Sequence, residues 1–349
     1  MRDSDRGARS GHAVARQRGG CGPASDRSVA MATRTAFLRL TCLIAWLPCI
    51  GAGDANASPV DDWVRSFAES QIVFQRATSN VPFPPLAFID VSQYQDAKVR
   101  RPHADSISYD QTNVSQGAAV PFLLGPRDVF VVGDWLGWSR FDARSTAAES
   151  FDVLSVGVPV GLLHQGSRRW QSAEFIMPLG HKTNLDDSSW SWETLGGVFA
   201  RYLQSDSLWW AFGLYADVKP GPDTYLPYLG VSWSIDDHWT LSAIMPWPAV
   251  MYAPTRDTLF RLGGAPSGAS WSLRPNGDQA AFTLDSWDLG AAAEHRIHGN
   301  FWLAIEAGVG GLRTLRVTDG ELREPDVSIS HSPYISVGVR FRPALTHDR

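Results

Sequence analysis

The sequence predicts an all-β chain that closes into a single antiparallel transmembrane β-barrel of about 12 strands, within a range of about 10–14. Three observations carry this prediction. Apolar and polar side chains alternate along many segments of about 9–15 residues. The chain contains 15 Trp but only three Lys, which are Lys98, Lys182 and Lys219. A segment with the three regions of a secretion signal precedes the alternating part.

The N-terminal 57 residues are expected to be separate from the fold. Arg34 and Arg39 form a positive region, 40–50 an apolar core, and 55–57 (Ala-Asn-Ala) a small-residue cleavage site. We therefore expect a signal peptide over 31–57 that is cleaved near Ala57. Residues 1–30 are rich in Arg, Gly and Ser, and they are interpreted as a disordered upstream extension or a misassigned start.

Composition bounds the class of the mature chain. The 44% hydrophobic and 19% charged content excludes a disordered protein. All three cysteines precede residue 58, so disulfides cannot hold the mature chain. Removing the eight basic and four acidic residues of 1–57 leaves a net charge of about −9, which argues against a nucleic-acid partner. No stretch reaches the roughly 20 uncharged apolar residues of a spanning helix.

Residues 225–247 show the alternation most clearly. In 225–235, the odd-numbered positions from Tyr225 to Ile235 face one way, and smaller or more polar residues face the other. Residues 236–238 (Asp-Asp-His) form a polar turn, and alternation resumes from Trp239 to Trp247. The same pattern recurs in 154–162, 190–202, 301–310 and 334–341. The expected division is an N-terminal periplasmic segment over 58–84, a barrel over 85–343 and a tail over 344–349.

A soluble β-sandwich also alternates, but its polar face should be rich in Lys, Glu and Thr. Here the face opposite the apolar one is mainly Gly, Ala and Ser with isolated charges, which favours a barrel with a lipid-facing stripe. Aromatic residues near the ends of these segments are expected to anchor the stripe at the membrane–water interface. They are Trp190, Trp192, Tyr202, Tyr225, Trp233, Trp239 and Trp247.

Charged residues on the small-residue face are expected to point into the lumen. The candidates are Asp134, Arg140, Glu193, Arg201, Asp288, Glu294, Glu306 and Arg340. Both signs occur in similar numbers, so these residues either brace a closed barrel as pairs or line a selective pore.

The stretch "YLPYLGVSWSIDDHWTLSAIMPWPAVMY", followed by "GASWSL" at 268–273, resembles an uncharacterised family of proteobacterial outer-membrane barrel proteins. The resemblance covers about 190–345 and implies an outer-membrane barrel of unassigned function, with no catalytic residues. One departure is that Phe341 is followed by "RPALTHDR", whereas outer-membrane barrels usually end on an aromatic residue.

A search for catalytic and metal sites gives no strong candidate. His331 and Ser332 are adjacent, so their side chains leave opposite faces of a strand. His295 and His298 lie three apart at a predicted hairpin end and do not converge on a metal. We expect no catalytic site, metal or cofactor, and we favour passive passage of small solutes over a lipid-modifying hydrolase or a purely structural barrel. The expected partners are outer-membrane lipid, including lipopolysaccharide, and the barrel assembly machinery.

Overall fold

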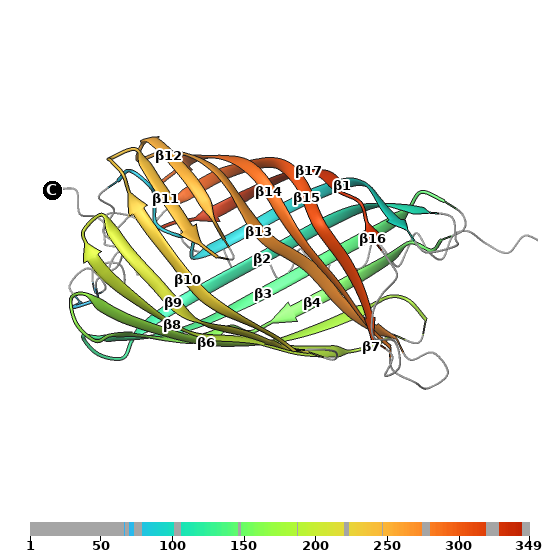
Figure 1. Cartoon of the computed structure of the whole chain (residues 1–349), viewed down its shortest axis with the longest axis horizontal. Coiled ribbons are helices and arrows are strands. Elements are labelled where there is room, and N and C mark those ends of the chain that lie inside the picture. The colour runs from blue at the N-terminus through green and yellow to red at the C-terminus, as the bar shows by residue number, and fades with distance from the viewer. Residues whose placement is uncertain are drawn as a thin grey trace, which may run out of the picture. The chain divides into compact units, whose positions relative to one another are not determined.

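The computed structural model describes Ser66 and residues 70–72, 79–100, 106–145, 148–186, 188–219, 223–245, 247–273, 280–318 and 328–343. The expected signal peptide, residues 1–30, the cleavage position near Ala57, the tail 344–349 and most of the expected periplasmic segment lie outside these residues. Within them, one continuous sheet accounts for every strand (Figure 1).

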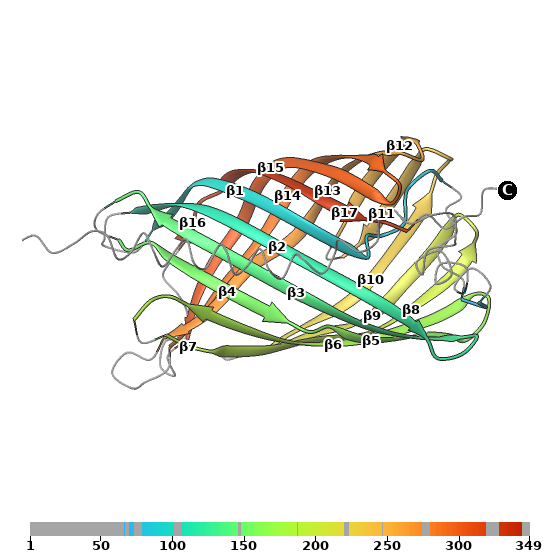
Figure 2. The same cartoon turned by 180° about the vertical axis from the view of Figure 1, so that it is seen from behind.

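The strands are β1 (Ala87–Arg100), β2 (Ile107–Leu123), β3 (Asp128–Ala143), β4 (Phe151–Gly157), β5 (Val160–Gln165), β6 (Trp170–Thr183), β7 (Ser188–Ser189), β8 (Ser191–Ser205), β9 (Leu208–Val218), β10 (Thr224–Ser234), β11 (Trp239–Ile244), β12 (Ala249–Thr255), β13 (Thr258–Leu273), β14 (Ala280–His298), β15 (Phe301–Thr318), β16 (Ser328–Ile329) and β17 (Ser332–Phe341). All pairings are antiparallel, and β1 pairs with both β2 and β17, which closes the sheet into a barrel (Figures 1 and 2). The closed antiparallel barrel predicted from alternation is therefore confirmed. The wall has 14 strand positions in the described residues, at the upper end of the expected range.

Short turns gather at one end of the barrel. The connections 124–127, 206–207 and 299–300 lie there, together with the paired residues Ala87 and Phe341. Gly299 adopts a φ of 51°, which the two-residue turn between β14 and β15 requires and which glycine adopts without strain. Several connections at the other end are longer, such as 144–150 and 319–327. We call these the short-turn end and the long-loop end.

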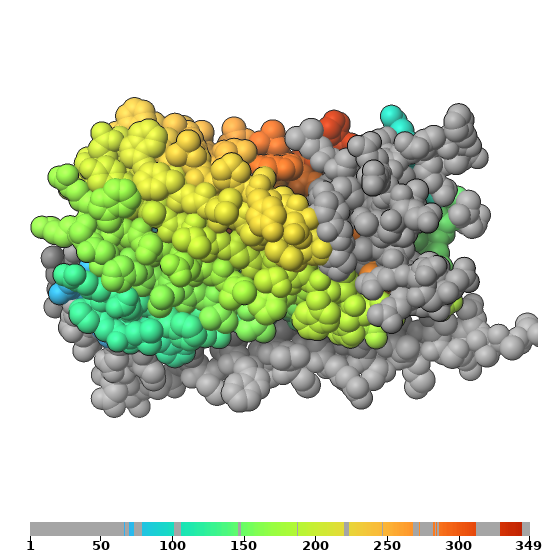
Figure 3. Space-filling view, turned by 60° about the horizontal axis from the view of Figure 1, so that its bottom comes forward, coloured from blue at the N-terminus to red at the C-terminus, as the bar shows by residue number. Residues whose placement is uncertain are grey.

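The two faces of the wall differ as the alternation predicts. On β17, Ile335 and Val337 are 52% and 47% exposed, whereas the neighbouring Ser332 and Tyr334 are buried. Exposed Val, Leu, Ile and Trp side chains recur on the same outer face of nearly every strand. Figure 3 shows the outer surface of the green to yellow strands in a space-filling view. In the described part of the chain, no helix is long and apolar enough to cross a membrane, a statement that concerns helices only.

Several irregularities interrupt the regular pairing, and two of them are supported by specific hydrogen bonds. Between β4 and β5, Pro159 lacks an N–H, and its carbonyl accepts a hydrogen bond from the Gly133 N–H at 2.8 Å. On β1, Asp96 has a φ of 53° within a register shift, and its N–H donates to the Asp110 carboxylate at 2.9 Å. An acidic side chain therefore supports backbone that would otherwise be strained.

Candidate functional site: the inner face of the barrel

The strand register decides which predicted residues face inward, since directly paired residues share a face of the sheet. Starting from the buried Tyr334 on β17, the register places six of the eight predicted residues on the inner face. These are Glu193, Arg201, Asp288, Glu294, Glu306 and Arg340.

Asp134 and Arg140 lie on the outer face, contrary to expectation. Gly117 pairs with Phe88 on β1 and with Trp135 on β3, so the odd-numbered residues of β3 point inward. Gln116 donates a hydrogen bond to Asp134 on that outer face. Arg140 forms ion pairs with Asp142 and Asp152, at 2.8 and 3.3 Å. Outward charges on β3 therefore pair along the outer surface and not across a lumen.

One side of the inner face, formed by β1, β13, β14, β15 and β17, carries linked charges that we call the charged wall. Its members are Asp90, Arg261, Asp288, Glu294, Glu306, Arg340 and Arg342. Arg261 donates to Glu306 at 2.5 Å, and Tyr334 donates to the other oxygen of this carboxylate at 2.6 Å. Arg340 and Arg342 each donate to one oxygen of Glu294 at 2.6 Å. Sequence reasoning missed Asp90, Arg261 and Arg342.

Glycines opposite these side chains explain how large polar groups fit against the wall. A Cβ on Gly290 would overlap the Tyr334 hydroxyl and lie 2.7 Å from Glu306 Oε1. A Cβ on Gly338 would overlap the Asp90 carboxylate. Tyr94 stacks on Tyr334 with ring centroids 5.0 Å apart and donates to Asp288 at 2.7 Å. Glycines on the inner face therefore leave the space that the side chains of the charged wall and Tyr334 occupy.

The opposite side of the ring, formed by β6, β8, β9 and β10, carries the aromatic wall: Phe175, Phe199, Tyr215 and Tyr228. Phe175 and Phe199 stack with centroids 5.9 Å apart, and Tyr228 meets Phe199 edge-on at 4.7 Å. A Cβ on Gly197 would come within 2.5 Å of the Phe199 ring, so this ring lies flat against the wall. The Phe175 ring is nearly parallel to that of Phe199, at 7°. The lumen is thus amphipathic across its width.

Three buried residues on β4, β6 and β8 form a separate cluster that sequence reasoning also missed in part. The Ser155 hydroxyl lies 2.7 Å from His181 Nδ1, and His181 Nε2 lies 3.1 Å from Glu193 Oε1. The sequence search considered His and Ser near each other on one strand, whereas this cluster spans three paired strands. The available signal was the inward parity of His181 in an alternating segment. In the described ranges, no group of three or more His, Cys, Asp or Glu could hold a metal.

Side-chain and backbone contacts occur inside the wall near both ends of the lumen. At the long-loop end, β7 pairs with the end of β13, and Leu284 of β14 packs with Phe141 and Val153 from β3 and β4. At the short-turn end, Ile72 packs on the inward-facing Val129. Nearby in sequence, the Asn80 N–H donates to the Asp237 carbonyl on the far side of the ring. In the described residues, contacts therefore cross or line the lumen near both ends of the barrel.

The predicted interface aromatics lie on the outside of the barrel. Trp190, Trp192, Tyr225, Trp233, Trp239 and Trp247 are all at least 40% exposed, and Tyr202 is half-buried against Trp170 at 4.9 Å. Trp190 lies between β7 and β8 and Trp247 between β11 and β12, so these two are not on strands.

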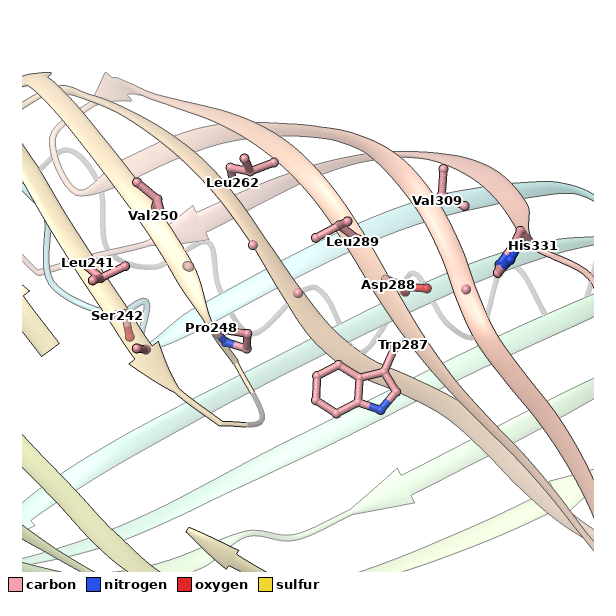
Figure 4. Close-up of a pocket in the computed structure, with 15 residues that line it drawn as sticks. Leu241, Ser242, Pro248, Val250, Leu262, Trp287, Asp288, Leu289, Val309 and His331 are labelled. Atoms are coloured by element: carbon pink, nitrogen blue, oxygen red, sulfur yellow. The ribbon is translucent and has the colours of Figure 1, made fainter. Parts of the chain in front are cut away.

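An apolar pocket of ≈ 650 Å³ lies on the outer face over β11 to β15. Figure 4 shows Val250, Leu262, Leu289 and Val309 on consecutive strands β12 to β15, with Trp287 at the side. These aliphatic side chains are 39–63% exposed. This pocket is therefore an open apolar groove, called the apolar groove below, into which apolar chains fit.

Comparisons with known proteins give only distant likeness. No protein-family model and no curated protein sequence matches the chain. Among solved structures, the chain is similar to a deletion mutant of the monoaromatic hydrocarbon channel TodX, with 11% identity, a TM-score of 0.42, and 73% of this chain and 89% of that chain covered. It is also similar to a Pseudomonas aeruginosa FadL homologue, with 10% identity, a TM-score of 0.41 and coverage of 73% and 90%. For the Ralstonia pickettii toluene transporter TbuX, the identity is 12%, the TM-score 0.38 and the coverage 84% and 96%. At these values the function of a neighbour does not transfer.

Proposed function

We propose that this protein is a gated outer-membrane barrel through which small solutes pass. In this proposal the chain reaches the outer membrane after its signal peptide is cleaved near Ala57. One observation carries the proposal. A closed ring of strands exposes aliphatic and aromatic side chains on its outside while its inside holds the charged wall. Water is absent from the hydrocarbon core, so a barrel that satisfies every backbone group within its own wall is the form of β-sheet that spans it.

The outer aromatic residues support the membrane assignment. Trp192 and Tyr225 lie near the long-loop end, and Trp233 and Trp239 lie near the short-turn end. Indole and phenol rings favour the headgroup region, so these residues would bracket a lipid-facing band. The apolar groove over β12–β15 would hold lipid acyl chains. We also propose lipopolysaccharide and the barrel assembly machinery as partners of this protein.

The inner face supports passage in preference to a purely structural role. A solid core would be filled by interlocking aliphatic side chains, as in small barrels. Here the aromatic wall is partly exposed, and Arg261, Glu306 and Arg340 keep about a fifth of their side-chain surface accessible. Solutes with a flat apolar part and a polar group would fit between the two walls. The Leu284 side chain meets Phe141 and Val153 from the opposite wall, and in this proposal passage requires that contact to open.

Conductance tests the proposal directly. The mature protein, purified in detergent and inserted in planar bilayers, should show discrete current steps, and proteoliposomes should swell in small solutes. Glu306→Gln should shift the ion selectivity toward anions, since it removes one lumen carboxylate. An absence of both current steps and swelling, in protein that shows a heat-dependent shift on gels, would leave a structural barrel as the better conclusion.

A further inference from the structure

The cluster of Ser155, His181 and Glu193 has the composition of a hydrolytic triad. All three side chains point inward from adjacent wall strands, with His181 between the other two. Their exposed fractions are 6%, 3% and 9%, so bulk water barely reaches them. A serine hydroxyl becomes a nucleophile only beside a base, and an imidazole works as that base when a third group orients it.

The two nitrogens of His181 have different partners, as this chemistry requires. Nδ1 faces the Ser155 hydroxyl at hydrogen-bond distance, and Nε2 faces the Glu193 carboxylate at 3.1 Å without the alignment of a formed hydrogen bond. A small ring rotation would align the N–H with the carboxylate, and such contacts commonly tighten when substrate binds. That tautomer leaves Nδ1 unprotonated to accept the serine proton.

The surroundings of Ser155 favour an apolar acyl group. Gly137 on β3 pairs directly with Ser155 on β4, and Gly157 lies two residues after Ser155 on the same face of β4. The Trp135 indole lies over Gly137, where an added Cβ would come within 2.8 Å of it. Leu179 and Met177 lie beside Gly157 at 3.0 and 3.3 Å from an added Cβ. The nucleophile is therefore next to small backbone positions and large apolar side chains.

We propose that Ser155, His181 and Glu193 hydrolyse carboxylic esters with an apolar acyl group, an activity separate from solute passage. His181 Nδ1 takes the hydroxyl proton as Ser155 Oγ bonds to the ester carbonyl carbon. The bond from that carbon to the alcohol oxygen then breaks, and the alcohol leaves with the proton from His181. Water attacks the acyl-serine, gives one proton to His181, and releases the acid as Ser155 regains its hydrogen. Glu193 is a positioning residue that holds the imidazole.

The test uses the mature protein in lipid vesicles, with p-nitrophenyl butyrate as substrate and a fluorophosphonate as active-site label. We expect hydrolysis by the wild type and one label per chain, located on Ser155 by peptide mass spectrometry. Ser155→Ala should lower the rate at least about 100-fold and abolish labelling. Glu193→Gln should lower the rate more than about tenfold, and Glu193→Asp should restore part of it.

Ser139→Ala is the matched control, because Ser139 is an inward serine on the neighbouring strand β3. It should change the rate less than about twofold. Heat-dependent gel mobility verifies that each variant is folded. Two results would overturn the proposal: folded wild type that neither hydrolyses the ester nor takes the label, or labelling that persists in Ser155→Ala. Either would show that the cluster only braces the wall.

Discussion

Arg342 donates a hydrogen bond to the buried carboxylate of Glu294 at 2.6 Å, although Arg342 lies one residue beyond the last strand. The same guanidinium donates to the Phe83 carbonyl before β1 and lies over the Trp302 ring at 5.7 Å. This contact therefore joins both ends of the barrel sequence to the inner face of β14. Glu294 is only 1% exposed, so the two arginines take the place of water as its hydrogen-bond partners.

Glu294→Gln should destabilise the folded barrel strongly. It leaves Arg340 and Arg342 with a neutral partner in a buried site, and breaking a buried ion pair costs about 3–5 kcal/mol. The measurement is urea unfolding in micelles followed by tryptophan fluorescence. Asp257→Asn is the control, since Asp257 pairs with Arg296 on the surface and is 54% exposed. It should cost less than about 1 kcal/mol. Equal losses of unfolding free energy in the two variants would contradict the expectation that the buried ion pair contributes more stability than the exposed one.

Facing can be tested with one substitution at two adjacent residues. Val337→Arg places a charge on the outer face, where the cost at the bilayer midplane is roughly 2–4 kcal/mol. Ser336→Arg places the same charge inward, directly opposite Glu306 on β15. The folded, heat-modifiable fraction in lipid should fall sharply for the first variant and little for the second. The reverse order would mean that the outer face is not in contact with lipid.

Asp134 is a carboxylate on the outer face, with Gln116 as its hydrogen-bond donor. If this part of β3 meets lipid, Asp134→Leu should stabilise the barrel, because it removes a charged side chain from the lipid-facing surface. The gain should be at most about 2 kcal/mol, since acidic residues on this surface cost less than basic ones. The gain should appear in bilayers and shrink in micelles, which admit more water. Lower stability of Asp134→Leu in bilayers would indicate a polar partner on this surface.

The alternation predicted the strands and their turns well, because a period of two is a local property of the chain. It did not assign the faces of β3. Trp135 and Phe141 point inward while Leu136 and Trp138 point outward, so both faces are apolar. The Ser–His–Glu cluster was also out of reach, since it depends on how β4, β6 and β8 align. The closure by Leu284 likewise depends on a contact between β14 and the far wall.

The turn between β10 and β11 should make stability depend on pH. The backbone N–H groups of His238 and Trp239 both donate to Asp236 Oδ1 at 2.8 Å, and these bonds lower the pKa of this carboxyl. A lowered pKa in the folded state contributes stability above the ordinary aspartate pKa, and that contribution is lost as the pH falls through the lowered value. Asp236→Asn keeps an acceptor but removes the titration. Unfolding midpoints between about pH 2 and pH 6 should therefore change less in this variant than in the wild type. Parallel curves would rule out this contribution.

Leu284 should control opening at the long-loop end. Its side chain is buried against Phe141 and Val153, which come from the opposite side of the ring. Leu284→Ala removes most of this contact and should raise the open probability in planar bilayers, at a cost of about 2–5 kcal/mol to the closed, folded state. Leu289→Ala is the matched control five residues later on β14, because Leu289 is 63% exposed on the outer face. It should leave gating unchanged. If both variants conduct like the wild type, the apolar contact between β14 and the β3–β4 wall does not close the lumen.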